Sequence, residues 1–290
     1  MIFLDATTDI AFKKLFSNQA KKSILISFLN SILGRVEGNL ITHVTITDPH
    51  NHPETRWSKA SIVDAACVDQ QGNKYIIEMQ VIDQKDYIPR CQFYTAEALV
   101  KQLKRGDAYT QLKPVIFVGI LCFSIFDTNN YLSHHLITDM ATQKQSLEHM
   151  EFHFIELPKF NVGLTKLNSV VDKWIYLLKN AADLTTIPEQ LRQPEAVEEA
   201  LETLERGAWK PRELDAYDRF IDTERVRASQ DLATIERGKK EGREEGLRAA
   251  SIKIAERLLE KQTPIAEIMQ LTELSREEIH ALGNSPKDKS

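Results

Sequence analysis

The sequence has few cysteines and no long apolar run, and each absence excludes a class of protein. Its three cysteines, Cys67, Cys91 and Cys122, lie in apolar segments without the close spacing of metal ligands. An odd number of scattered cysteines is typical of reduced thiols in a cytosolic protein. The longest apolar run, residues 114–126, is shorter than the about 18 residues that cross a bilayer. The apolar run before Asp5 is too short for a signal peptide, so we expect a soluble, cytoplasmic protein.

The sequence also lacks the excess of positive charge expected of a protein that binds nucleic acid over its whole surface. Its formal net charge is −5, which still allows a local basic groove. A length of 290 residues suggests about two domains. Strand-like patterns end before Pro188, and Glu, Arg, Lys, Ala and Leu dominate after it. We therefore predict an α/β domain at 1–185 and a charged helical region at 186–290.

The first domain alternates between helical and strand-like apolar patterns, which predicts a mixed sheet flanked by helices. The expected order is a helix at 9–33, a strand at 40–48, a hairpin at 60–82, a helix at 89–103, a strand after Pro114, a strand at 152–157 and a helix at 164–182.

The second region is rich in charge of both signs. Gly238, Gly242 and Gly246 recur every four residues in "ERGKKEGREEGLR", so the segment is either a solvated helical connector or a helix for self-association. Two short helices follow, one after Pro264 and one from Ser275, and together they resemble a helix-turn-helix. Because the second of them is acidic, a role in packing or protein interaction is favoured over contact with DNA phosphates.

Two carboxylates carry the chemistry of the first domain. The polar cluster 69–73 predicts a hairpin turn, and a turn centred on Gln71 pairs Asp64 with Glu78. Like charges directly across a strand pair are destabilising and costly to bury. A cation between the two acids would remove that cost, so this pair predicts a metal-dependent site. His50-x-His52 has no third ligand of suitable spacing, and no zinc site is predicted there.

The order of elements and several motifs resemble a known family. These motifs are "DIAFKKLFSN", "SFLNSILG", "KASIVDAACVDQQGNKYIIEMQV", "PRCQFYTAEAL" and the C-terminal "GKKEGREEG". They are similar to the recombination-promoting nuclease (Rpn) family, also described as PD-(D/E)XK nuclease-family transposases. The resemblance implies a restriction-endonuclease-like PD-(D/E)XK core, with a mixed central sheet between helices. It also implies a Mg²⁺-dependent DNA endonuclease, with Mn²⁺ as a possible substitute, and a link to DNA recombination or mobile elements.

The resemblance assigns roles to residues of the hairpin and the following helix. Asp64 and Glu78 would hold the metal, since hard divalent cations prefer oxygen ligands. Gln80 stands where many relatives outside this family carry lysine, and an amide cannot replace that charge. Lys59 or Arg90 would then supply positive charge near the substrate.

Three further residues each have two alternative interpretations. Asp9 matches the acid of the N-terminal motif and is either a third catalytic acid or a helix N-cap. Tyr94 lies one turn after Arg90, either at the edge of the site or in a surface stack. Lys13 and its neighbouring lysines line either a phosphate track or a solvated helix face.

The function expected from these features is hydrolysis of DNA with little sequence specificity. One alternative is a catalytically weak or inactive nuclease fold that serves as a DNA- or protein-binding assembly module. Another is a phosphodiesterase that acts on RNA. The helical region at 186–290 is expected to mediate homo-oligomerisation or to bind a helical partner, and no membrane association is expected.

Overall fold

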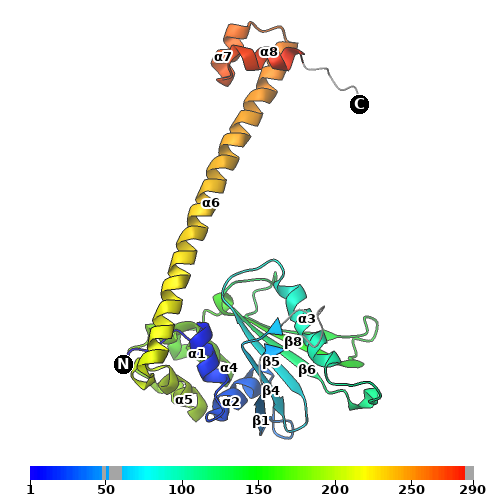
Figure 1. Cartoon of the computed structure of the whole chain (residues 1–290), viewed down its shortest axis with the longest axis vertical. Helices are drawn as coiled ribbons and strands as arrows, with labels where there is room; N and C mark the ends of the chain where they lie inside the picture. Colours follow the sequence, from blue (N-terminus) through cyan, green and yellow to red (C-terminus); the bar gives the residue numbers. More distant parts are fainter. Residues whose placement is uncertain (48–49, 52–60, 285–290) are drawn as a thin grey trace. The chain divides into compact units, whose positions relative to one another are not determined.

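The computed structural model describes residues 1–47, 50–51 and 61–284 (Figure 1). The chain forms two compact units, Met1–Phe220 and Ile221–Ser290. The predicted boundary near residue 185 stays a prediction. No helix in the described part of the chain combines the length and the apolar character needed to cross a bilayer.

The first unit is built on a six-stranded mixed sheet in the order β1-β4-β5-β6-β8-β7. Strands β4 and β5 are antiparallel, whereas β5, β6 and β8 run parallel to one another. This confirms the expected fold class of a mixed sheet flanked by helices. The six strands are β1 (Val44–Thr47), β4 (Ala65–Asp69), β5 (Lys74–Gln80), β6 (Val115–Leu121), β7 (Leu132–Ile137) and β8 (Leu147–Glu156), and a separate short ribbon joins β2 (His50–Asn51) to β3 (Ser61–Ile62).

The register of the β4–β5 hairpin agrees with the sequence prediction. Ala65 pairs with Ile77 and Cys67 pairs with Tyr75, which centres the turn on Gln71. The Asp69 carboxylate accepts hydrogen bonds from turn amides, as expected of an Asx-type turn.

Helices cover both faces of the sheet, as Figure 1 shows. Tyr87 and Cys91 of α3 pack against Ile76 and Phe117 on one face. The other face is covered by α1, α2 and α4 (Figure 1), where Trp174 is fully buried against aromatic rings of the first two helices. The helices of this unit are α1 (Asp9–Phe16), α2 (Lys22–Ile32), α3 (Tyr87–Val100), α4 (Val170–Asn180) and α5 (Glu195–Leu204), and α6 (Pro211–Glu260) begins within it.

The structure corrects three details of the sequence prediction. The helix expected at 9–33 is interrupted, because Asn18 accepts a hydrogen bond from the Ala20 amide and forms a turn between α1 and α2. Strand β7 was not predicted, since its segment "LSHHLI" is polar and largely exposed. Val81, which the alternation of Ile77 and Met79 along the strand would place in the core, is exposed because it follows the last residue of β5.

The second unit is helical, as predicted. Helix α6 is continuous through Gly238, Gly242 and Gly246. The helices α7 (Ile265–Thr272) and α8 (Arg276–Asn284) follow. A capping box begins α8, because the Ser275 hydroxyl accepts a hydrogen bond from the Glu278 amide and the Glu278 carboxylate accepts one from the Ser275 amide. A small apolar core joins the three helices through Ala255, Ile268, Leu274 and Ile279.

Candidate active site

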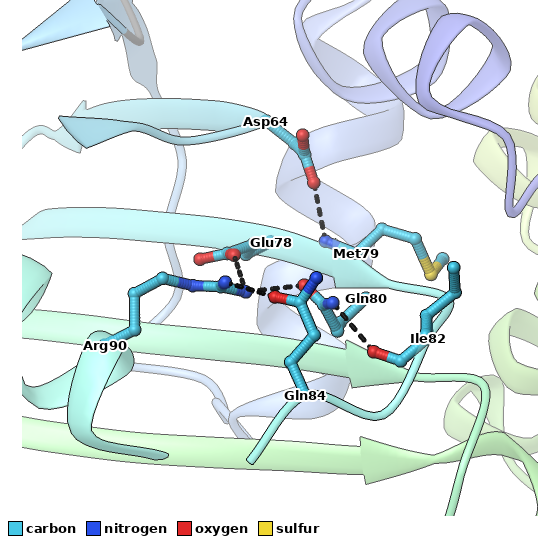
Figure 2. A network of polar contacts seen from close by, with 7 residues as sticks. All are labelled: Asp64, Glu78, Met79, Gln80, Ile82, Gln84 and Arg90. Atoms are coloured by element: carbon cyan, nitrogen blue, oxygen red, sulfur yellow. Dashed lines mark hydrogen bonds and ion pairs between the residues drawn. The ribbon is translucent and has the colours of Figure 1, made fainter. Parts of the chain in front are cut away.

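Asp64 and Glu78 come from the two arms of the hairpin. Asp64 directly precedes β4, and the register of the following pairs places it opposite Glu78. Its Oδ2 accepts a 2.7 Å hydrogen bond from the backbone amide of Met79, as Figure 2 shows. The Ser17 hydroxyl, just after α1, donates to the Asp64 carbonyl oxygen at 3.2 Å. The hairpin and the end of α1 therefore fix the position of the first acid.

Both carboxyls hold their protons more tightly than usual. Burial raises the pKa of Asp64 to about 6, an effect that the Met79 hydrogen bond reduces and the nearby Asp9 charge increases. Burial also raises the pKa of Glu78 to about 7, against the attraction of Arg90 and with a contribution from the negative charge of Asp64. A site with two such acids gains stability when a cation neutralises them.

The second acid keeps one oxygen without a partner. Glu78 is 7% exposed, and its Oε2 is buried without a hydrogen bond. Buried polar atoms are normally paired, so this oxygen is suited to a ligand. An all-carboxylate donor set fits a hard divalent cation such as Mg²⁺. The carboxylates of Asp9, Asp64 and Glu78 do not all lie within 4.8 Å of one another.

Arg90 of α3 connects the helix to this strand (Figure 2). Its Nη2 lies 3.3 Å from Glu78 Oε1 and donates to Gln80 Oε1 at 2.6 Å. Its Nη1 donates to Gln84 Oε1 at 2.6 Å. The Gln80 amide in turn donates to the Ile82 carbonyl oxygen at 2.8 Å. Gln80 thus orients the arginine beside Glu78. No local pattern in the sequence points to Gln84, because its contact with Arg90 depends on the fold of the loop after β5.

Asp9 and Lys13 lie on α1 beside Asp64. The N-cap of α1 is Thr8, whose hydroxyl accepts from the Ala11 amide, so Asp9 is not the cap. Asp9 lies 2.8 Å from Lys13 Nζ. Its charge and a hydrogen bond between the two carboxyls raise the pKa of Asp64, whereas the charge of Lys13 lowers it.

Two predicted residues remain, Tyr94 near the site and Lys59 outside the described residues. Burial raises the pKa of Tyr94, and the negative charge of Glu78 adds to this effect, so the phenol lies within the field of the second acid. Lys59 lies outside the described residues, and so does His52. The fold therefore gathers Asp9, Lys13, Asp64 and the Arg90 network at one end of the hairpin.

One comparison with known proteins gave a match. The model of a family described as PD-(D/E)XK nuclease family transposase matches residues 6–235. This range holds the whole sheet, the two carboxylates and the beginning of α6. No curated protein and no solved structure matches the chain.

Proposed function

The chain belongs to the PD-(D/E)XK nuclease family of transposases, and on that premise we propose that it is a Mg²⁺-dependent DNA endonuclease of low sequence specificity. Membership of the family implies nuclease-type chemistry, DNA as the partner and a divalent cation. The proposal places hydrolysis of a phosphodiester bond at Asp64 and Glu78. It also includes Mg²⁺ or Mn²⁺ as the cation and a cytoplasmic role in recombination or mobile-element processes.

The observation that carries the proposal is the buried, unpartnered Oε2 of Glu78 beside a second acid. Ionising both carboxyls without a cation is unfavourable, as their raised pKa values indicate. We assign metal binding to Asp64 and Glu78. A divalent cation held there lowers the pKa of a coordinated water and stabilises negative charge on a phosphate.

The other groups position the acids and balance their charge. The Met79 amide holds Asp64 Oδ2, and a hydrogen bond joins the Asp64 carboxyl to that of Asp9, a contact that a bound cation would replace. We propose that Asp9 sets the proton affinity of Asp64. We propose that Lys13 attracts an approaching DNA phosphate. Arg90 would supply the positive charge that Gln80 lacks, because a guanidinium stays charged and binds phosphate through two N–H groups.

A catalytically weak or inactive nuclease fold, used for DNA or protein binding, is the second candidate. The contacts of Gln80 favour it, since its amide is occupied by Arg90 and by the Ile82 carbonyl. With these contacts in place, neither the oxygen nor the nitrogen of the Gln80 amide is free to orient a water molecule. For either candidate we propose that the C-terminal helices mediate self-association or bind a helical partner.

Nicking of supercoiled plasmid tests the proposal. We expect the full chain to cleave with Mg²⁺ or Mn²⁺, and Asp64→Asn and Glu78→Gln each to lower the rate at least about 100-fold. Glu148→Gln is the matched control, because Glu148 is an exposed acid on β8 and its loss should leave the rate unchanged. Arg90→Gln should slow cleavage more than Arg90→Lys, which keeps the charge.

Inactivity of the wild-type chain with every divalent cation would refute the endonuclease. Persistent binding of DNA that weakens with added salt would then support the binding module. Cleavage of RNA but not of plasmid would instead identify an RNase. Full activity of both site variants would show that the reaction occurs elsewhere or comes from a contaminant.

A further inference from the structure

A second group of potential metal ligands lies on strands β7 and β8. His134 of β7 pairs directly with His153 of β8, and Glu151 lies two residues before His153 on the same strand. Side chains alternate between faces of a sheet, so Glu151, His153 and the paired His134 share one face. None of these residues is part of the site that contains Asp64.

This group lies on the opposite face of the sheet from Glu78. In the parallel ladders, Glu78, Gly119 and Phe154 form one row across β5, β6 and β8. His153 belongs to the adjacent row, and adjacent rows point to opposite faces. Glu78 and His153 therefore point to opposite faces of the sheet, so the histidine group is separate from the carboxylate of Glu78.

The three side chains converge on one point. His153 Nε2 lies 2.7 Å from Glu151 Oε1, and His134 Nε2 lies 2.8 Å from the same oxygen. The two imidazole rings are stacked, with centroids 4.1 Å apart and planes inclined by 16°. Among the residues that the structure describes, this is the one group of three or more His, Cys, Asp or Glu side chains whose ligand atoms all lie within 4.8 Å of one another.

The donor set selects the kind of cation. Two imidazole nitrogens and one carboxylate oxygen form the ligand set of three-residue Zn²⁺ sites, in which a fourth position stays open to water. Mg²⁺ prefers oxygen ligands alone. The side chain of His134 is 45% exposed, whereas that of His153 is 4% exposed. The open position would thus lie on the solvent side, at the edge strand of the sheet.

The charges around the group are compatible with this ligand set. Burial and the neighbouring ring lower the pKa of His134, which keeps its nitrogen lone pair available at neutral pH. Burial acts against ionisation of Glu151, but the two histidines and Arg35 hold its pKa below the usual value. Arg35 is the charged group that opposes a cation here, so we expect weaker binding than at a four-ligand structural zinc site.

We infer that His134, Glu151 and His153 form a binding site for Zn²⁺ or a similar transition-metal ion, distinct from the proposed catalytic cation site. The bound ion replaces the shared hydrogen bonds on Glu151 with coordination bonds and joins the edge strand β7 to β8. The inference does not depend on nuclease activity, since it rests on the geometry of the opposite face.

Titration of the untagged, metal-free full chain with Co²⁺, followed by its visible absorption, tests the site. We expect one equivalent to give the intense bands of four-coordinate Co²⁺, and Zn²⁺ but not excess Mg²⁺ to displace it. His134→Ala should weaken binding at least about 10-fold, and so should Glu151→Gln. His149→Ala is the matched control, because His149 is an exposed histidine on the same strand outside the group.

Thermal unfolding gives a second readout that separates loss of binding from loss of folding. His134 is the ligand of choice for substitution, because its exposed side chain can be truncated with little effect on the core. Zn²⁺ should raise the melting temperature of the wild type and of Glu78→Gln but not that of His134→Ala. The inference is overturned if His134→Ala binds Co²⁺ as tightly as the wild type, or if Co²⁺ gives only the weak spectrum of the hydrated ion.

Discussion

Replacing Glu78 by glutamine should remove cleavage and at the same time stabilise the fold. The carboxyl is 7% exposed, and its pKa rises from 4.5 to about 7 on folding. The folded chain therefore binds this proton more tightly than the unfolded chain does. This contribution to stability is fully present below pH 4.5 and is lost as the pH rises to about 7.

The size of the effect follows from the pKa change. At about 1.4 kcal/mol per pKa unit, ionisation of Glu78 lowers the free energy of unfolding by about 3 kcal/mol at about pH 8. At about pH 5 most of the folded protein is still protonated there, and the loss is below about 1 kcal/mol. Glutamine carries no charge at either pH, so the advantage of Glu78→Gln over the wild type should grow by about 2 kcal/mol between them.

Urea unfolding in the presence of a chelator measures this difference. Tryptophan fluorescence reports on the unit that contains Glu78, since all three tryptophans of the sequence, among them the fully buried Trp174, belong to Met1–Phe220. Glu148→Gln controls for the loss of an exposed acid. Added Mg²⁺ should stabilise the wild type and narrow the gap, because it binds the folded chain only when both carboxylates are present. The reasoning would be refuted if the difference in free energy of unfolding between Glu78→Gln and the wild type were the same at both pH values. It would also be refuted if the wild type were the more stable protein at about pH 8.

Two further substitutions probe the surroundings of the site. Asp9→Asn removes a charge that raises the pKa of Asp64, so the midpoint of the increase in cleavage rate with pH should shift to lower pH by about half a unit. An unchanged pH–rate profile would show that Asp9 has no influence on that acid. Gly119→Ala places a methyl group 2.6 Å from Tyr87 Oη and should lower the free energy of unfolding by about 1–3 kcal/mol. Gly163→Ala, with no atom within 4 Å of its added carbon, is the control, and equal stabilities of the two alanine variants would contradict the packing.

The hairpin and its two acids were predictable from the sequence because the information is local. A polar turn with a glycine, between two alternating strands, sets the register without reference to the rest of the chain. The pairing of Ala65 with Ile77 follows directly. The family resemblance, confirmed over residues 6–235, then assigned the proposed site to this hairpin.

The parts that the sequence did not predict depend on contacts between distant segments. Strand β7 carries polar residues on an exposed edge and is fixed by pairing with β8, so its own pattern is weak. Because that strand was missed, nothing in the sequence placed His134 beside His153. The contact between Arg90 and Gln80 likewise requires α3 to fold back over β5, which no local pattern specifies.

The hydrogen bond between the Met79 amide and Asp64 makes one backbone proton a reporter of the site. The 2.7 Å contact takes the place of a strand-to-strand bond at the point where β4 begins. Protonation of Asp64 or coordination of its other oxygen changes the electron density on the acceptor, and the amide resonance of Met79 will move with it. A single nuclear magnetic resonance signal, followed through a titration with acid or with a divalent ion, therefore reads the state of the first acid in a chain that has not been substituted at all.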